Sequence, residues 1–274
     1  MPIKSQEPVL AHQNQAFLES DAGRQVRILS EFLAPDVTFE KEDIRNTIVL
    51  FGSARTLPPS EIKKRLKKEK NPKEIAKLKR LSLVAEYYDK AHELSKRLGK
   101  WANCRREGYA ICTGGGPGIM EAGNRGAYDV GTTSIGFNIK LPFEQHPNPY
   151  ITPAFNMQFR YFFIRKFWFL FKARALIAFP GGFGTLDELF ETLTLIQTHK
   201  LYKIMTVVLF GKAYWEKLIN WQFLIDTGMI NAEDLNIFYM TDDVNEAYSF
   251  VTKALEKHPK IPSATGVHDF GNLK

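Results

Sequence analysis

The stretch that decides the fold is residues 175–191, which read ALIAFPGGFGTLDELFE. It begins with an apolar run, Ala175–Phe179, that has the length and composition of a strand buried in a parallel sheet. The glycine-rich segment Pro180–Gly184 follows, and after it Leu186, Leu189 and Phe190 are spaced as on one face of a helix. The stretch therefore predicts a strand, a glycine turn and a helix in direct succession.

This succession predicts a binding site for an anion. Backbone N–H groups and the positive end of a helix face the space above such a turn, and glycine lets the backbone approach a ligand where a Cβ atom would collide. We expect Gly181, Gly182 and Gly184 to hold a phosphate, with Thr185 capping the helix and its hydroxyl reaching a phosphate oxygen. The alternative is a plain tight turn.

Glu188 has two interpretations. Thr185 and Glu188 have the spacing of a capping box, in which the glutamate only accepts a hydrogen bond from the N-cap N–H. Asp187, Glu188 and Glu191 also form an acidic cluster beside the expected phosphate, where a carboxylate would repel the ligand unless it faced the sugar instead. The density of carboxylates favours the second interpretation, in which Glu188 faces a sugar.

Further strand and helix patterns alternate along the chain. Strands are expected at 47–51, 109–112, 133–139, 205–211 and 238–241, and helices at 82–101, 119–127, 159–173, 214–227 and 242–257. This alternation predicts an α/β fold with a doubly wound, Rossmann-like parallel sheet in a single domain with an N-terminal helical extension. We divide the chain into an extension at 1–40, a Rossmann-like domain at 41–258 with a basic helical insertion at 61–80, and a tail at 259–274.

Other candidate ligand-binding residues follow the expected strands. Ser53 follows the first strand, Gly115 and Gly116 follow the second, and Glu144 lies in a proline-rich loop after the third. The carboxyl ends of parallel strands are where ligands bind in open α/β sheets. Arg165 and Lys166 lie in the aromatic helix at 159–173, and either extend to solvent or point at a nucleotide.

Composition excludes several classes of function. No apolar run reaches the roughly 18 residues of a membrane span, and the N-terminal residues lack a secretory signal, so we expect a cytoplasmic protein without a membrane partner. Cys104, Cys112 and the histidines have no metal-ligand spacing, and no Walker A or dinucleotide motif occurs, so no metal or organic cofactor is expected. Residues 61–80 contain ten Lys or Arg and three Glu, a net charge equal to the +7 of the whole chain. Without aromatic residues for base stacking, this run favours a solvated helix over nucleic-acid binding.

The sequence resembles a known family at these residues. Residues 180–188 match the pattern P-G-G-x-G-T-x-x-E, Arg165-Lys166 precedes it, and Gly52-Ser53 and Gly114–Gly116 lie upstream. Together they are similar to the Lonely Guy-type phosphoribohydrolases, long mislabelled as lysine decarboxylases. The similarity covers about residues 46–257, and the terminal segments and basic insertion resemble those of a longer bacterial subgroup.

The resemblance implies a function for these residues. It implies hydrolysis of the N-glycosidic bond of a purine nucleoside 5′-monophosphate, AMP or an N6-substituted AMP of the cytokinin type, to free base and ribose 5-phosphate. Arg165 and Glu188 are then catalytic. The implied substrate-binding and phosphate-binding residues are Ser53, Gly115, Gly116, Glu144, Lys166, Gly181, Gly182, Gly184, Thr185 and Asp187. A homodimer or higher homo-oligomer is also implied.

Alternative functions use the same sheet. A non-catalytic protein would bind or sense a nucleotide without cleaving it. Ribosyl transfer would differ from hydrolysis only in the group that accepts the ribose, which would be another base instead of water. Lysine decarboxylation with pyridoxal phosphate needs a Schiff-base lysine, for which the sequence has no motif.

Overall fold

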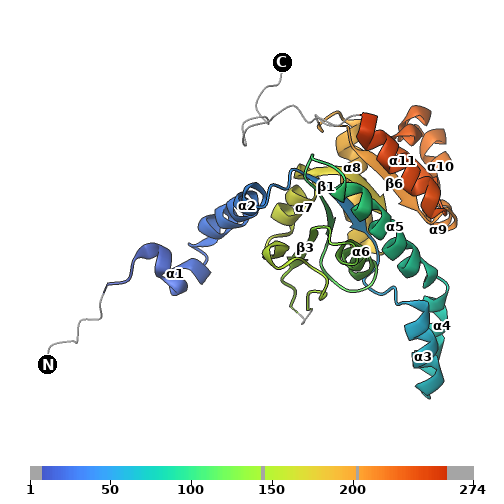
Figure 1. The fold of residues 1–274 in the computed structure, drawn as a ribbon, viewed down its shortest axis with the longest axis horizontal. Coiled ribbons are helices and arrows are strands. Elements are labelled where there is room, and N and C mark those ends of the chain that lie inside the picture. The colour runs from blue at the N-terminus through green and yellow to red at the C-terminus, as the bar shows by residue number, and fades with distance from the viewer. Residues whose placement is uncertain (1–7, 143–145, 202–203, 258–274) are drawn as a thin grey trace.

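The computed structural model describes residues 8–142, 146–201 and 204–257. They form a single seven-stranded sheet with the order β4-β3-β2-β1-β5-β6-β7, and every pairing is parallel (Figure 1). The strands are β1 (Asn46–Phe51), β2 (Tyr109–Thr113), β3 (Ser134–Ile139), β4 (Asn156–Phe159), β5 (Ala173–Ala178), β6 (Thr206–Phe210) and β7 (Phe238–Thr241). The expected α/β, doubly wound, Rossmann-like fold is confirmed.

Helices cover both faces of this sheet. The α-helices of the described residues are α1 (Gln15–Glu19), α2 (Arg24–Lys41), α3 (Pro59–Lys68), α4 (Pro72–Ser82), α5 (Glu86–Asn103), α6 (Ile119–Tyr128), α7 (Phe162–Phe171), α8 (Phe183–Gln197), α9 (Lys212–Leu218), α10 (Trp221–Asp226) and α11 (Val244–Lys257). One buried apolar core joins the sheet to α2, α7, α8 and α9, and a second joins it to α5, α6 and α11. Strands β1, β2 and β5 are buried along their whole length, as their apolar runs predict.

The segment before β1 packs against the sheet layer through α2. The Phe39 ring of α2 stacks on Trp168 of α7 with 5.7 Å between ring centroids, and the Trp168 indole N–H donates to the Glu31 carbonyl over 3.2 Å. Figure 1 shows α1 and α2 forming an arm that leads away from the sheet. One face of α2 therefore belongs to the core, although residues 1–40 are expected from the sequence as an extension.

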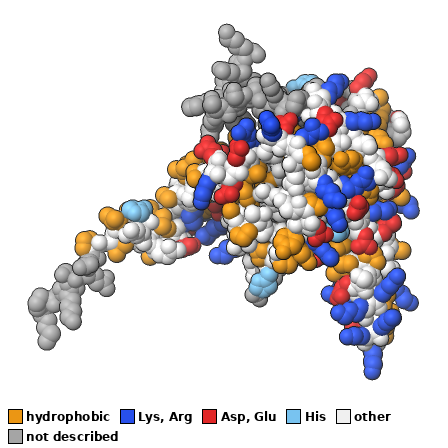
Figure 2. All heavy atoms as spheres, in the orientation of Figure 1, with side chains coloured by type: hydrophobic (Ala, Val, Ile, Leu, Met, Phe, Trp, Pro, Cys, Tyr) orange, Lys and Arg blue, Asp and Glu red, His pale blue; other side chains and the backbone are white. Residues whose placement is uncertain are grey.

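The basic segment at 61–80, expected as a helical insertion, forms a hairpin of two helices. Helix α3 ends at Lys68, and α4 begins at Pro72 after Asn71, whose side chain accepts a hydrogen bond from the Lys73 N–H. Proline fits the first turn of a helix and breaks its interior, which explains the division. Figure 2 shows the cationic side chains gathered over this hairpin, where it projects from the body.

Three other elements differ from the sequence expectation. Strand β4 forms an edge of the sheet that was not predicted from the sequence. The helix expected at 214–227 is two helices, α9 and α10, because the chain is extended at Ile219 and Asn220 caps the second helix. The helix expected from Ser82 begins at Glu86. The tail expected at 259–274 lies outside the described residues.

No helix in the described part of the chain has both the length and the apolar character needed to cross a bilayer.

Candidate active site

The order of the strands defines the place of the site. From β1 the chain builds outward through β2, β3 and β4 in one direction and through β5, β6 and β7 in the other. The neighbours β1 and β5 therefore flank the point where the strand order reverses, and a crevice at their carboxyl ends is the usual ligand site of such sheets. The turns after these two strands meet there, because the Ser53 N–H donates to the Pro180 carbonyl over 3.0 Å.

The helix after β5 begins earlier than the sequence suggests. Helix α8 starts at Phe183 with Gly182 as its N-cap, and no described side chain caps it. Thr185 is thus the third helical residue, so the expectation that it caps the helix is wrong, and so is the capping box with Glu188. The Thr185 side chain is buried against Gly181, where a Cβ atom would come 2.1 Å from its hydroxyl oxygen. The first N–H groups of α8 are therefore left available to a ligand.

The glycines of this turn divide into two kinds. Position 181 requires glycine for a steric reason, since a side chain there would displace Thr185. At Gly182 and Gly184, by contrast, a Cβ atom would meet nothing within 4 Å, and neither residue has a positive φ. Glycine is unfavourable relative to alanine in a helix, so Gly184 has no evident structural advantage there. Open space at this turn is what close approach of a ligand to the backbone requires.

Arg165 and Glu188 form a buried pair beside the turn. Arg165 is in the first turn of α7 and Glu188 in the second turn of α8, and their Nη2 and Oε1 atoms lie 3.6 Å apart. The side chains are 13% and 5% exposed. Arg165 Nε and Glu188 Oε2 have no hydrogen-bond partner among the described residues. Because buried polar atoms are almost always paired, these two have hydrogen-bonding capacity left for a ligand or water.

Burial sets the charge behaviour of this pair. It raises the pKa of Glu188 to about 7, and the positive charges of Arg165 and Lys166 only partly oppose the shift. Burial also lowers the pKa of Arg165, against the carboxylates of Glu188 and Asp187. Burial disfavours the charged form of either group, which explains both directions. The site thus contains a carboxyl group that changes its protonation state near neutral pH.

Lys166 and Asp187 bind each other. The Lys166 ammonium lies 3.0 Å from Asp187 Oδ1 and 3.1 Å from Glu191 Oε2. Burial alone would lower the pKa of Lys166, but hydrogen bonds to these two carboxylates raise it. Asp187 is itself half-exposed. The Lys166 charge is therefore balanced by protein carboxylates, whereas Lys166 and Asp187 were both expected to bind the substrate.

The glycine turn after β2 is held by a hydrogen-bond network that was not predicted from the sequence. The buried Asn148 amide donates to the Gly115 and Gly116 carbonyls over 3.0 Å each and to Asn124 Oδ1 over 2.8 Å. Gly115 has φ +72°, and a Cβ atom there would come 2.3 Å from Asn138 Oδ1. Gly115 is therefore required by the backbone itself, whether or not a ligand binds.

Ser53 and Glu144 are the two remaining residues that were expected to bind a ligand. The Ser53 hydroxyl oxygen accepts a hydrogen bond from the Arg55 N–H over 3.0 Å, and the Ser53 carbonyl accepts from the Ile119 N–H over 3.1 Å. Ser53 thereby connects the start of α6 to the turns after β1 and β5. Glu144 lies outside the described residues.

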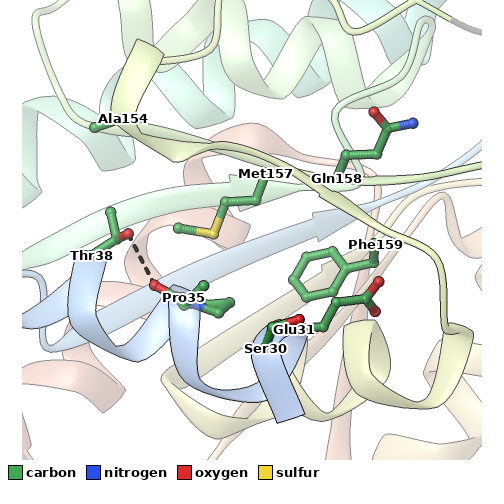
Figure 3. A pocket seen from close by; sticks show the side chains of 9 residues that line it. Ser30, Glu31, Pro35, Thr38, Ala154, Met157, Gln158 and Phe159 are labelled. Carbon is green, nitrogen blue, oxygen red and sulfur yellow. Dashed lines mark hydrogen bonds between the residues drawn. The ribbon is translucent and has the colours of Figure 1, made fainter. Parts of the chain in front are cut away.

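A hollow of about 310 Å³ lies elsewhere, between α2 and β4 (Figure 3). Figure 3 shows Met157 and Phe159 of β4 facing Pro35 of α2 across it. Glu31 is the ionisable residue of its lining, and the Glu31 carboxylate accepts hydrogen bonds from the Arg160 and Tyr161 N–H groups over 2.8 and 3.2 Å. Backbone N–H groups thus already bind the Glu31 carboxylate, and we place the candidate site at the carboxyl ends of β1 and β5.

Comparison with known proteins gives a family match and several similar folds. Residues 120–251, slightly less than half of the chain, match the model of a family described as "Possible lysine decarboxylase", which supports a relationship to that family of possible enzymes. No curated protein matches the sequence.

Three solved structures illustrate the similar folds. TM1055, a structural-genomics target, has a TM-score of 0.48 at 22% identity, covering 76% of this chain and 99% of that chain. The molybdenum cofactor carrier protein from Chlamydomonas reinhardtii has 0.46 at 19%, covering 78% and 99%. The molybdenum cofactor binding protein from Rippkaea orientalis has 0.45 at 14%, covering 77% and 98%. These likenesses concern the fold alone.

Proposed function

We propose that this protein hydrolyses the N-glycosidic bond of a purine nucleoside 5′-monophosphate, AMP or an N6-substituted AMP, to free base and ribose 5-phosphate. The observation that carries the proposal is Glu188, a buried carboxyl group with a pKa of about 7 and an unpaired oxygen, 3.6 Å from a buried arginine. Strongly shifted pKa values at a sheet's ligand-binding edge are typical of catalytic groups. The resemblance to Lonely Guy-type phosphoribohydrolases supplies the reaction and the substrate class.

The turn at 181–184 is the proposed seat of the 5′-phosphate. The uncapped N-terminus of α8 offers N–H groups and positive potential, and Gly182 and Gly184 leave the space above the backbone open. Phosphate binding there would fix the ribose over α8, one turn before Glu188. Binding energy from this remote group is then available to orient the sugar for reaction.

Glu188 and Arg165 are the proposed reacting groups. Cleavage breaks the bond between C1′ and the base nitrogen, whose electron pair leaves with the base, while positive charge grows on C1′ and O4′. The Glu188 carboxylate stabilises that charge and accepts a proton from the water whose oxygen bonds to C1′. The base nitrogen takes up a proton from solvent as it leaves, and Glu188 afterwards returns its proton to solvent. Arg165 favours the ionised form of Glu188 and can bind the phosphate or ribose hydroxyls.

The site does not fit lysine decarboxylation with pyridoxal phosphate. That chemistry needs a lysine whose neutral amine forms a Schiff base with the cofactor. The lysine of this site, Lys166, is held between Asp187 and Glu191, and these contacts raise its pKa, which favours the unreactive ammonium form. We therefore derive no step through that cofactor.

Base release from AMP tests the proposal. Purified protein should liberate adenine and ribose 5-phosphate in equal amounts, and a panel of nucleoside monophosphates, including N6-substituted AMP, should define the preferred base. Glu188→Gln and Arg165→Ala should each lower turnover at least about a hundredfold, the scale of a lost acid–base or electrostatic group.

The controls are Glu216→Gln and Arg45→Ala, which change exposed ion-paired residues of the same types. Both should retain normal rates. Binding of AMP without release of base from any member of the panel would contradict hydrolysis and favour a nucleotide-binding protein.

A further inference from the structure

The turn between β5 and α8 has a row of backbone donors without acceptors. The N–H groups of residues 181–185 make no hydrogen bond to any described residue, whereas the next one, at Leu186, donates to the Gly182 carbonyl over 3.0 Å. The first N–H groups of a helix have no acceptor within the helix, and no described side chain supplies one here. The direction in which these donors point therefore decides whether the turn can bind an anion.

Two carbonyls of the same turn are held from outside it. The Tyr214 hydroxyl donates to the Gly181 carbonyl over 2.6 Å, and the Ser53 N–H donates to the Pro180 carbonyl over 3.0 Å. Burial raises the pKa of the Tyr214 hydroxyl, so it remains a donor at neutral pH. The two carbonyl oxygens are therefore bound to protein donors, while the N–H groups that follow them remain available.

Helix α9 holds the Tyr214 side chain in this place. Gly211, which precedes α9, has φ +101°, and a Cβ atom there would come 3.1 Å from the Pro180 ring, so the start of α9 lies against the turn. The buried Trp215 indole N–H donates to the Ala178 carbonyl over 3.2 Å, which connects α9 to the end of β5. The Tyr214 ring packs edge-on against Trp215 with 5.3 Å between ring centroids. A fixed helix therefore presents the hydroxyl to the turn.

One peptide group links Tyr214 to the row of donors. The Gly181 carbonyl and the Gly182 N–H belong to the same planar trans peptide, in which they point in opposite directions. Glycine on both sides gives this peptide more rotational freedom than other residues would. The hydrogen bond that holds the Gly181 carbonyl therefore also fixes the direction of the Gly182 N–H.

We propose that Tyr214 is a positioning residue of the phosphate-binding turn, whose hydroxyl holds the Gly181 carbonyl so that the Gly182 N–H stays directed at the phosphate. Tyr214 itself does not touch the ligand. If the peptide rotated, the carbonyl oxygen would face the phosphate and repel it. The inference rests on the proposed function only through the phosphate seat at 181–184, and not through the cleavage of the glycosidic bond.

Tyr214→Phe removes the hydroxyl and keeps the ring with its contact to Trp215. The Gly181–Gly182 peptide of this variant should populate rotated forms that cannot bind phosphate, and the apparent affinity falls by the fraction of molecules that remain competent. We expect the dissociation constant for inorganic phosphate to rise roughly three- to tenfold, the effect of one lost hydrogen bond.

Calorimetric titration of the full-length protein with inorganic phosphate, AMP and adenosine measures this effect. Tyr214→Phe should bind phosphate and AMP more weakly by similar factors, and should bind adenosine, which has no phosphate, as wild type does. A general loss of structure would weaken the binding of all three ligands. The control is Tyr239→Phe, which removes a hydroxyl that donates to Glu246 over 3.1 Å in the edge strand β7 and should leave all three affinities unchanged.

Three results would overturn the role of Tyr214. They are an unchanged phosphate affinity in Tyr214→Phe, a loss of adenosine affinity as large as that of AMP, and a wild-type protein that binds no inorganic phosphate. A selective loss of phosphate affinity in a protein that releases no base would support the role of Tyr214 and contradict the proposed reaction, so the two proposals can fail separately.

Discussion

The surroundings of Glu188 determine its pKa. It is 4% exposed, and burial raises its pKa to about 7 although Arg165 lies 3.6 Å away. A carboxyl group with an ordinary pKa is a weak base at neutral pH, and one near 7 is matched to proton transfer there. The proposed reaction uses the ionised form of Glu188, so its rate should follow this titration.

We predict that kcat/KM for base release rises about tenfold per pH unit below pH 7 and levels off above it. The pH profile of wild-type protein measures this break, and Glu188→Gln should lose it along with most of the activity. A stability measurement provides an independent check. The folded state binds the Glu188 proton more tightly than the unfolded chain, so wild-type stability should fall relative to Glu188→Gln as pH rises from about 4.5 to 7. A stability difference that is constant over this range would contradict the raised pKa.

Replacing Gly184 should raise the stability of the protein and weaken its binding of AMP. Its φ is not positive, and a Cβ atom would meet nothing within 4 Å, so alanine fits the folded chain. Gly184→Ala should stabilise the protein by up to about 1 kcal/mol because glycine disfavours the helix. It should also weaken AMP binding, because the methyl group enters the proposed phosphate seat.

Thermal unfolding and AMP titration measure the two effects of Gly184→Ala. The control is Thr194→Ala, an exposed position of the same helix two turns beyond Glu188, which should leave AMP affinity unchanged. Undiminished AMP affinity in Gly184→Ala would show that the phosphate does not approach this turn.

Some site residues were accessible from the sequence and others were not. Arg165 and Glu188 were chosen from a motif, and the fold brings them together from α7 and α8. Thr185 was misplaced because a glycine N-cap leaves no side-chain signal for the start of a helix. Asn148 was missed because its partners, the Gly115 and Gly116 carbonyls, are 32 or more positions away in the chain. Only the folded backbone brings such a residue to its turn.

Among the elements, the buried strands were the most predictable and the edges of the fold the least. Strands β1, β2 and β5 contain the apolar runs 48–51, 109–112 and 175–178, which is the pattern of a strand covered on both faces. Strand β4 reads Asn-Met-Gln-Phe, in which Asn156 and Gln158 are exposed and Phe159 is buried, so its pairing with β3 leaves no such pattern. The α3–α4 hairpin was anticipated as helical, but Pro72 and the Asn71 cap decide that it is two helices.

We predict that the charge of the α3–α4 hairpin is dispensable for turnover. Lys63, Lys64, Lys67 and Lys68 are exposed, and exposed charges are screened beyond about 8 Å at physiological ionic strength. Replacing all four lysines by Gln should keep kcat for base release within about threefold at that ionic strength. A tenfold loss of kcat in a variant with normal thermal unfolding would assign the hairpin to the catalytic machinery.

On the scale of the molecule, the strand order brings distant parts of the chain to one place. Ser53 follows β1, Gly182 follows β5, and Arg165 comes from the helix between β4 and β5. No short segment contains all of them, and they meet because β1 and β5 pair in parallel at the reversal of strand order.

The central claim is that a nucleotide phosphate binds at the start of α8 while Glu188 faces the carbon of the glycosidic bond. The most direct measurement is a crystal structure of Glu188→Gln, which should bind AMP without cleaving it. The account predicts the phosphate within hydrogen-bonding distance of the backbone N–H groups at 182–185, and the substituted side chain at position 188 beside C1′ with Arg165 close to it. AMP bound away from the carboxyl ends of β1 and β5, or in the reverse orientation with its base at the start of α8, would contradict it.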